Sequence, residues 1–440
     1  MSAAWPAPTL PSPLPFTMLS ARVSTDTRVT LHTVPLPTLC HPHALLVRVA
    51  SCGTNPKDWK LPAGILQTIR PSSDPGFSDG MNSGDDVAGY VAAIGPAVTE
   101  FRVGDRVAGL HELGVEDGAA FAEYAVVMDW VAFHLGPDCA PPHPLPVLAP
   151  ESDSAHAASV GGVGDFSAGS GIGFDEAATV PMACLMAAIG LFGMLRVTSG
   201  PWAPLEGHDA DDEDNKADEG KQRPLVIYGA AGAVGAYAVQ LAQLVNVHPV
   251  ICVAGRGMEF VRSLLDEGKG DTVVDYRLGP DKVVQGIKDA LKGRLLMDAF
   301  DATSENGSFI NLSRVVAPGG HISLVLPAFR PEIPSFIRQS TTMAGCLWKN
   351  MAVHAKSEKR TLGRLDVGQN GREFGLMYSR LIGLWLREGK LKPHPVVVVE
   401  GGLRGLEKAL QDLRAGRASA VKYVVRIGET KEITERERKS

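Results

Sequence analysis

The chain lacks several features that would assign it to a specialised class of protein. Its 440 residues include only six cysteines, and no two of them form a Cys-x-x-Cys pair. Cysteines scattered in this way do not build a disulfide framework or a thiolate zinc site, and they are typical of a reducing compartment. Basic residues do not exceed acidic residues, 43 against 49. This balance excludes the basic footprint of a nucleic-acid-binding protein.

The net charge of −6 belongs to one segment of the chain. Residues 206–221 hold eight acidic and two basic side chains, a local charge of −6, so the remaining residues are neutral overall. This segment lies within 201–223, and a second segment, 137–173, is rich in Pro and Gly. We expect both to be inserted flexible loops, because they have too little apolar surface to offset the entropy lost on ordering. For the acidic segment 201–223, the alternative is a tail that binds a partner.

A membrane span and a secretion signal are also missing from the pattern. We find no run of the about 18 apolar residues that crosses a bilayer, so no membrane association is expected. Residues 1–18 are rich in Pro and lack the basic and apolar regions of a signal peptide. We therefore expect these residues to form a loose leader and the protein to be cytoplasmic.

Two kinds of hydrophobic pattern divide the chain. Between residues 19 and 131, short alternating runs separated by Gly, Pro and Asp turns predict a compact barrel-like unit of β-strands. After residue 223, apolar strands alternate with helical patterns, which predicts βαβ units and a parallel sheet buried on both faces. A strand-helix-strand tail follows at 396–427. The predicted fold class is therefore α/β.

The strongest motif is a glycine-rich turn at the start of the α/β region. An apolar run, 224–228, leads into three glycines spaced three apart, and a helical pattern follows them. Glycines let the backbone approach a pyrophosphate, whose charge meets the free N–H groups and the dipole of the helix. A tight turn without a ligand is the alternative. The residues predicted to bind a dinucleotide here are Gly229, Ala231, Gly232, Ala233, Val234 and Gly235.

The end of the next strand indicates which nicotinamide cofactor the turn binds. An NAD site usually places a carboxylate there to bind the ribose 2′-hydroxyl, whereas a guanidinium suits a 2′-phosphate. This chain has no carboxylate at that point and has Arg256 instead. We predict NADPH over NADH, although a solvated loop charge is the alternative role for this arginine. The predicted contacts are Ala254, Gly255, Arg256 and Gly257.

Further motifs resemble the medium-chain dehydrogenase/reductase superfamily over nearly the whole chain. The matching runs are Asn55–Lys60 (NPKDWK), Gly84–Gly89 (GDDVAG), Val103–Gly109 (VGDRVAG) and Asp175–Pro181 (DEAATVP). The resemblance implies a GroES-like β-barrel catalytic domain and a Rossmann domain with a doubly wound parallel sheet, with a cofactor cleft between them. The implied boundaries are 19–178 for the catalytic domain, 395–440 for its returning tail, and 179–394 for the Rossmann domain.

Within the superfamily, the chain looks most like the fungal enoyl reductases that act in trans with polyketide synthases. The closer likeness rests on Lys57–Lys60, on Asp275–Arg277 and on the tail from His394, while the glycine turn is that of quinone-reductase-like members. Zinc-dependent relatives carry Cys and His at the positions of Asn55 and Asp85 in this chain. These two residues do not complete a tetrahedral zinc shell, so no catalytic zinc is expected.

The resemblance also implies roles for individual residues. Lys60 is the candidate for a cationic contact to the cofactor or to a substrate enolate, and Asp58 is the candidate to orient it. A surface lysine and a turn cap are the alternatives. The further cofactor contacts implied are Lys57, Asp58, Trp59, Lys60, Tyr276, Ala302, Thr303, Val421 and Lys422. The resemblance also implies that two stretches line an acyl cleft, and a plain hydrophobic core is the alternative role for them. The residues of these stretches are Ala177, Ala178, Thr179, Val180, Pro181, Met182, Ala183 and Cys184, with Gly319, Gly320, His321, Ile322 and Ser323.

The function that the resemblance implies is the NADPH-dependent reduction of an α,β-unsaturated (enoyl) thioester in polyketide biosynthesis. The substrate would be presented by a carrier domain of the synthase, and the enzyme would be a monomer or a homodimer. Hydride transfer to the β-carbon needs no metal when the two carbons are held in contact. A general quinone or enone reductase is the alternative enzyme, and an NADPH-binding sensor or scaffold is the alternative without turnover.

Overall fold

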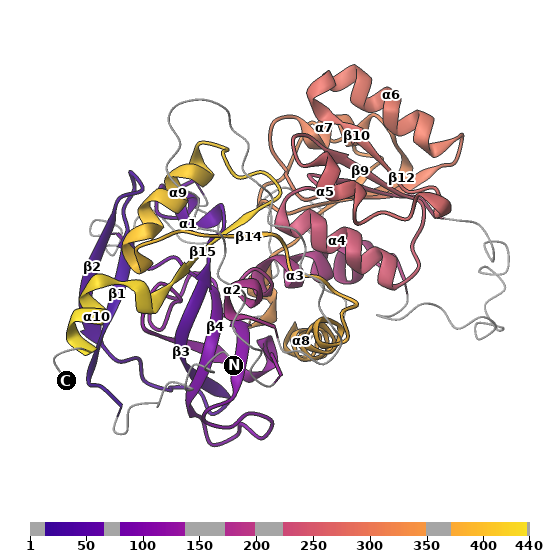
Figure 1. Cartoon of the computed structure of the whole chain (residues 1–440). Helices are drawn as coiled ribbons and strands as arrows, with labels where there is room; N and C mark the ends of the chain where they lie inside the picture. The colour runs from indigo at the N-terminus through magenta and orange to yellow at the C-terminus, as the bar shows by residue number, and fades with distance from the viewer. Residues whose placement is uncertain (1–13, 66–79, 137–171, 199–222, 349–370, 438–440) are drawn as a thin grey trace, which may run out of the picture. The chain divides into compact units, whose positions relative to one another are not determined.

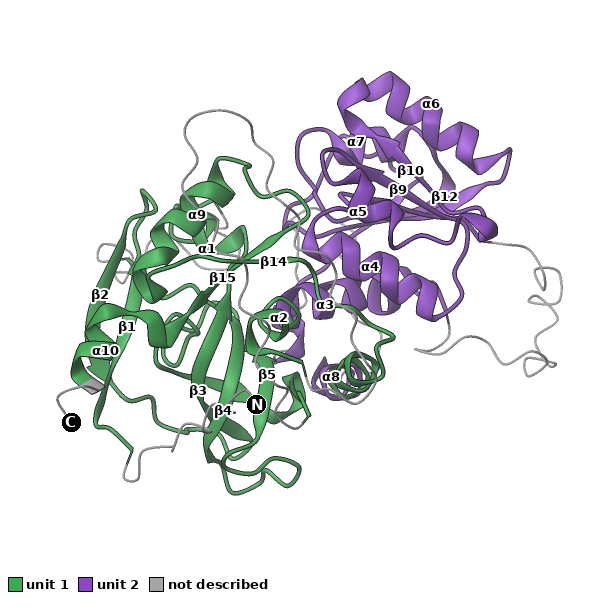
Figure 2. Cartoon of the chain, viewed as in Figure 1, with its two compact units in different colours: residues 1–181, 379–440 green, residues 182–378 purple. Residues whose placement is uncertain are grey.

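The computed structural model describes residues 14–65, 80–136, 172–198, 223–348 and 371–437 (Figure 1). The chain forms two compact units, unit 1 (1–181 and 379–440) and unit 2 (182–378) (Figure 2). The expected first boundary, 178/179, lies close to the observed one. The expected return at 395 lies after helix α8 (Gly371–Arg387), whereas unit 2 ends inside this helix. Most of the expected leader and of the two expected insertions lies outside the described residues.

Unit 1 is built on a β-sheet, as the alternating pattern predicts. Its strands follow the order β14-β15-β3-β4-β5-β7, with β6 also paired to β3, and β1 and β2 form a separate antiparallel pair. All pairs in the larger sheet are antiparallel except β14 with β15. The strands are β1 (Thr17–Val23), β2 (Val29–Pro35), β3 (Ala44–Gly53), β4 (Asp86–Ile94), β5 (Arg106–Leu110), β6 (Tyr124–Met128), β7 (Ala132–His134), β14 (Val396–Val398) and β15 (Lys422–Arg426).

The C-terminal tail joins unit 1 through strand β15. Val424 in β15 is opposite Gly53, the last residue of β3, so residues from the two ends of the chain meet at the end of β3. Helix α1 follows β3 directly, and helix α9 lies beside α1 (Figure 1). The helices of unit 1 besides the end of α8 are α1 (Lys57–Lys60), α2 (Phe174–Ala177), α9 (Leu406–Arg414) and α10 (Lys431–Glu437).

Unit 2 contains a six-stranded parallel sheet in the order β10-β9-β8-β11-β12-β13. The strand order reverses between β8 and β11, which is the point where doubly wound sheets bind ligands at their carboxyl ends. The α/β class with a parallel-sheet domain is therefore confirmed. The strands are β8 (Leu225–Tyr228), β9 (Val250–Ala254), β10 (Thr272–Asp275), β11 (Leu296–Asp301), β12 (Val316–Leu324) and β13 (Arg338–Thr341).

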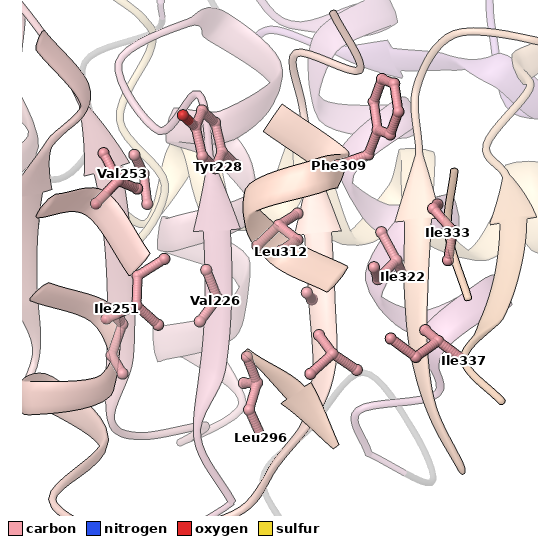
Figure 3. Packing of buried hydrophobic residues seen from close by; sticks show 14 of the residues in the cluster. Val226, Tyr228, Ile251, Val253, Leu296, Phe309, Leu312, Ile322, Ile333 and Ile337 are labelled. Carbon is pink, nitrogen blue, oxygen red and sulfur yellow. The ribbon is translucent and has the colours of Figure 1, made fainter. Parts of the chain in front are cut away.

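The core of unit 2 forms where apolar strands meet the helices that cover them. Figure 3 shows Val226 and Ile251 on neighbouring strands and Leu312 on the helix that packs against β11 and β12, and all three are fully buried. Burying these side chains removes apolar surface from water, which is the main force that holds such a sheet and its helices together. The described helices are α4 (Ala233–Leu244), α5 (Met258–Arg262), α6 (Pro280–Leu291) and α7 (Ser308–Ser313), with α3 (Pro181–Ala188) at the boundary between units.

One described stretch contradicts the expectation that the chain lacks a long apolar run. Residues Phe174–Leu195 comprise α2, α3 and a π-helical turn, and they are long and apolar enough to cross a membrane by length and composition. The apolar window is 100% buried, however, so it forms part of the protein's own core. In unit 2, a Cβ on Gly190 would lie 2.2 Å from the Phe300 ring, which shows how closely this segment packs on β11.

Candidate functional site

The segment after β3 is folded around buried charges in unit 1. The backbone N–H of Asn55 donates to Asp58 Oδ2 (2.7 Å), and Asn55 Nδ2 donates to Asp86 Oδ2 (2.7 Å). Asp58 and Asp86 are both fully buried. Buried carboxylates require such partners, because an unpaired charge away from water is very costly. These bonds fix the backbone that leads into α1.

Lys57 supplies a cation to this cluster. Its Nζ lies 2.7 Å from Asp58 Oδ1 and 2.7 Å from Asp85 Oδ2, and it also donates to the carbonyl oxygen of Ser83. Burial disfavours the charge on Lys57, but the two carboxylates outweigh it and raise the pKa of the ammonium above its usual range. Burial likewise raises the pKa values of Asp58 and Asp85, and Lys57 opposes that rise.

Lys422 supplies a second cation from β15, at the other end of the chain. Its Nζ lies 2.6 Å from Asp86 Oδ2, 3.1 Å from Asn55 Oδ1 and 3.3 Å from the carbonyl oxygen of Thr179. An ammonium has three N–H groups. Lys422 uses all three here, and Lys57 has three acceptors of its own. Either ammonium would therefore have to give up an internal bond to contact a cofactor, so both act first as structural cations.

Lys60 and Trp59 complete α1. Lys60 is buried, and its Nζ lies 5.6 Å from the centroid of the Trp59 ring, within the range of a cation–π interaction. Asp58 is bonded to Lys57 and to the backbone of Asn55, which gives it the role of organising this turn. Val421 is half-buried and directly precedes β15, so it continues the tail that brings Lys422 into the cluster.

In unit 2, the glycine turn lies at the carboxyl end of β8. Gly229 has a φ of +78°, a left-handed conformation that glycine adopts without strain. A Cβ on Gly235 would lie 2.3 Å from the carbonyl oxygen of Gly229, so only glycine fits there. Gly232, which caps α4, has room for a Cβ on its protein side, since the nearest atom is 3.4 Å away. The turn thus presents the N-terminus of a 12-residue helix, and the residue that caps it, Gly232, has no side chain.

The end of β9 matches the second half of a dinucleotide site. Ala254 ends the strand, and Gly255, Arg256 and Gly257 follow it. A Cβ on Gly255 would lie 2.5 Å from the ring of Tyr276, so the tyrosine ring lies directly against this glycine. Tyr276 is 48% exposed, which leaves much of its ring available for contact. The neighbouring carboxylate, Asp275, is paired with Arg277.

Asp301, at the end of β11, is a residue of this region that the sequence reasoning missed. Its carboxylate accepts hydrogen bonds from the N–H groups of Thr303 (3.0 Å) and Ser304 (2.7 Å) and from the Ser308 hydroxyl (2.6 Å). Burial raises its pKa to about 6. The turn it holds carries Ala302 and places Thr303 Oγ1 2.3 Å from where a Cβ of Gly229 would be. The only sequence signal was an Asp followed by small polar residues after a strand.

Comparison with known proteins assigns this arrangement to a family. Residues 41–137 match the alcohol dehydrogenase GroES-like domain. Trans-enoyl reductase fsr4 from Gibberella fujikuroi is 34% identical over 391 residues, which cover 88% of this chain and 93% of that protein. The chain belongs to the medium-chain dehydrogenase/reductase superfamily. Trans-enoyl reductase poxP from Penicillium oxalicum is 28% identical over 440 residues, covering 95% of this chain and 98% of that protein.

Solved structures of this superfamily share the fold. CurK enoyl reductase superposes with a TM-score of 0.59 at 19% identity, covering 93% of this chain and 99% of that chain. The quinone oxidoreductase from Coxiella burnetii superposes with a TM-score of 0.55 at 18% identity, covering 93% and 99%. Both superpositions cover the GroES-like part and the parallel-sheet part of this chain.

The positions where zinc-dependent superfamily members carry ligands are engaged by ammonium groups. Asn55 Oδ1 accepts from Lys422, and Asp85 Oδ2 pairs with Lys57. A cation is therefore already placed at each of these oxygens, and a second positive charge beside them would be repelled. Across the described parts of the chain, no three His, Cys, Asp or Glu side chains are grouped to hold a metal ion. These residues do not fit a catalytic zinc.

The first predicted stretch of an acyl cleft is buried. In unit 1, the carbonyl oxygens of Ala178 and Thr179 face Gly53 and Lys422, and the Thr179 hydroxyl donates to the carbonyl oxygen of Glu176. In unit 2, burial raises the pKa of the Cys184 thiol, which leaves it a neutral, apolar group. Such burial is expected if this stretch belongs to the hydrophobic core, which is the alternative to a role in an acyl cleft. The buried residues are Ala177, Ala178, Thr179, Val180, Pro181, Met182, Ala183 and Cys184.

The second predicted stretch of the cleft lies along β12. In the parallel register His321 is opposite Asp298, near the start of β11, and Gly319 and Gly320 precede it. They therefore lie toward the amino end of the sheet, away from the glycine turn. Burial lowers the pKa of His321 to about 4, so it is neutral. Ile322 is in the core. Ser323, the second-last residue of β12, is opposite Phe300 and therefore lies near the carboxyl edge, where its hydroxyl is 3.0 Å from the Thr342 hydroxyl.

Proposed function

We propose that the protein is an enoyl reductase that uses NADPH to saturate the C=C bond of an α,β-unsaturated thioester. The observation that carries the proposal is the 34% identity with a trans-enoyl reductase over 88% of this chain. The glycine turn of unit 2 supports it, since its backbone suits the pyrophosphate of a dinucleotide. Enoyl reductases of this superfamily use a nicotinamide cofactor.

The residues of unit 2 fit such a cofactor. The N–H groups of the first turn of α4, from Ala233 to Gly235, would bind the pyrophosphate, and the cap residue, Gly232, adds no side chain there. Tyr276 would stack against the adenosine end and Arg256 would pair with its 2′-phosphate, which favours NADPH. Ala302 and Thr303, held by Asp301, would lie beside the nicotinamide. When bound, the nicotinamide supplies the hydride that reduces the alkene.

The chain's own residues would position the substrate and stabilise charge. The carbonyl oxygen of an enoyl thioester gains negative charge as hydride reaches the β-carbon. Lys60, buried on α1, is the candidate donor to that oxygen, and Asp58 with Lys57 holds α1 in place. Because ammonium groups engage Asn55 and Asp85, the proposed mechanism is zinc-independent.

The proposed physiological substrate is an enoyl chain carried as a thioester in a fungal polyketide pathway. The trans-enoyl reductase names of the relatives support a separate synthase as partner, with the acyl chain presented on its carrier domain. We propose that the enzyme acts in the cytoplasm as a monomer or a homodimer. Ala177–Cys184, as a buried wall, and Ile322 and Ser323, at the carboxyl half of β12, remain the proposed acyl contacts. Gly319, Gly320 and His321 lie toward the amino end of the sheet, so they are not proposed as acyl contacts.

A substrate panel tests the proposal. Purified protein with NADPH is expected to reduce crotonyl thioesters and to leave simple quinones unreduced, with product mass as the readout. Reduction of quinones without reduction of thioesters would favour the general quinone reductase instead. Tight NADPH binding with no oxidation by either class would favour the sensor or scaffold.

A further inference from the structure

The turn after β11 in unit 2 holds Ser304 in a conformation that serine rarely adopts. Its φ is +56°, in the left-handed region that favours glycine, and the residue is fully buried. Such a backbone persists only where its surroundings fix it, and it is concentrated at active sites and ligand-binding turns. The turn lies beside the glycine turn, since Thr303 Oγ1 is 2.3 Å from where a Cβ of Gly229 would be.

Other residues engage every polar group of Ser304. Its N–H donates to Asp301 Oδ1 (2.7 Å), and its hydroxyl donates to the carbonyl oxygen of Asp301 (2.9 Å). The same hydroxyl accepts from the N–H of Val325 (2.9 Å), and the carbonyl oxygen of Ser304 accepts from Arg330 Nη2 (3.0 Å). Asp301 ends β11 and Val325 directly follows β12. Of these three partners, Arg330 is the one that reaches the turn from a separate segment.

Arg330 is itself held on two sides. Its backbone N–H donates to Gln339 Oε1 (2.9 Å), and its carbonyl oxygen accepts from Gln339 Nε2 (3.1 Å), so its backbone is tied to β13. Its guanidinium carbon lies 5.1 Å from the centroid of the Phe309 ring, on α7. These contacts restrict the side chain before it meets Ser304. The bond to the turn therefore comes from a donor that is already oriented.

Two local costs meet at this turn. Ser304 is strained, and Arg330 Nε is buried without a hydrogen-bond acceptor among the described residues. Costs of this kind call for an explanation, and a functional site is one. We propose that Arg330 is a positioning residue for the cofactor: it holds the carbonyl group of Ser304 and thereby fixes Ala302 and Thr303 against the nicotinamide. This rests on the proposed function, because it assumes that NADPH binds unit 2.

A matched pair of ligands tests the proposal. NADPH and 2′-phospho-ADP-ribose share the adenosine end and the pyrophosphate, and the second lacks the nicotinamide. Arg330→Met removes the donor to Ser304 and keeps a long side chain beside Phe309. It is expected to weaken NADPH binding about fivefold, the loss of about one hydrogen bond, and to leave the affinity for 2′-phospho-ADP-ribose unchanged. Calorimetry measures both affinities without turnover. Arg314→Met, which removes an exposed arginine paired with Asp281, is the control and should change neither.

A conservative variant separates the hydrogen bond from the bulk of the side chain. Arg330→Lys keeps a cationic donor that can reach a carbonyl oxygen, so it should recover part of the affinity for NADPH that Arg330→Met loses. A lysine variant that binds NADPH as weakly as the methionine variant would contradict a role for the donor.

An equal loss for both ligands in Arg330→Met would overturn the proposal, since it would mean that Arg330 only supports the fold of unit 2. Unchanged affinities for both would overturn it as well. So would a wild-type protein that binds NADPH no more tightly than 2′-phospho-ADP-ribose, because the turn would then not contact the nicotinamide. Failure of the proposed function gives a different result: NADPH binds and Arg330→Met weakens it, but no thioester is reduced.

Discussion

The candidate site in unit 1 is held together by charged side chains, whereas the glycine turn in unit 2 is held by backbone. In unit 1, Lys57 and Lys422 connect buried carboxylates that come from distant parts of the chain. In unit 2, the turn requires residues without a side chain, and Gly229, Gly232 and Gly235 meet this requirement. The two sites therefore fail in different ways when they are altered.

The difference between the two sites determines which substitutions are damaging in each unit. Removing one partner of a buried ion pair leaves the other charge uncompensated, and the whole unit loses stability. Adding a methyl group to a glycine turn either clashes with the protein or stands in the path of a ligand. Unit 1 is thus sensitive to the loss of atoms, and unit 2 is sensitive to their addition.

The largest expected effect is the loss of the buried cation in unit 1. Lys422→Met leaves Asp86 buried without its ammonium and is expected to lower the free energy of unfolding by about 3–5 kcal/mol. Lys408→Met is the matched control, since Lys408 is largely exposed and its partner, Asp412, keeps a second cation in Arg417, so the expected loss is about 0–1 kcal/mol. Urea denaturation measures both. Equal losses for the two variants would contradict the assignment of Lys422 as a structural cation.

The next largest effect is the pH dependence of stability that arises from Asp301, the buried carboxylate beside the glycine turn of unit 2. Burial raises the pKa of Asp301 from 3.8 to about 6, so between these pH values the folded state binds more protons than the unfolded state. Its contribution to stability therefore falls as pH rises from about 4 to about 6, by up to about 3 kcal/mol. Comparing wild type with Asp301→Asn at each pH isolates this contribution from the buried histidines. A difference that does not vary with pH would contradict it.

Two glycine substitutions separate folding from ligand approach. Gly235→Ala is expected to destabilise unit 2 by about 1–3 kcal/mol, because its Cβ would lie 2.3 Å from a backbone oxygen. Gly232→Ala has room on the protein side, so it should keep the melting temperature and weaken NADPH binding. Thermal unfolding and calorimetry measure the two properties. If Gly232→Ala binds NADPH as tightly as wild type, the dinucleotide does not approach this turn.

The smallest effect concerns cofactor choice. Arg256→Ala is expected to lower the ratio of NADPH to NADH efficiency about tenfold, through the loss of a charge-assisted contact to the 2′-phosphate. Arg262→Ala, an exposed arginine paired with Glu259 on the following helix, is the control. Steady-state kinetics with both cofactors give the ratio. An unchanged ratio in Arg256→Ala would remove the argument for NADPH.

The same contrast explains what the sequence could predict. The glycine turn is local, so its strand, glycines and helix were found together, and β8 lies within the predicted apolar run 224–228. The pair between Lys422 and Asp86 joins residues 336 positions apart, and no local pattern indicates it. Asp301 was missed because its partners are mainly backbone N–H groups. The long apolar stretch was missed because Pro181 interrupts it.

Transfer of deuterium from labelled NADPH to a crotonyl thioester tests the central claim most directly. With deuterium at the transferable position of the nicotinamide, the purified protein is predicted to yield a saturated thioester that carries one deuterium at the β-carbon, with one NADPH consumed per product. A saturated product without deuterium at that carbon, or oxidation of NADPH without a saturated product, would contradict the account.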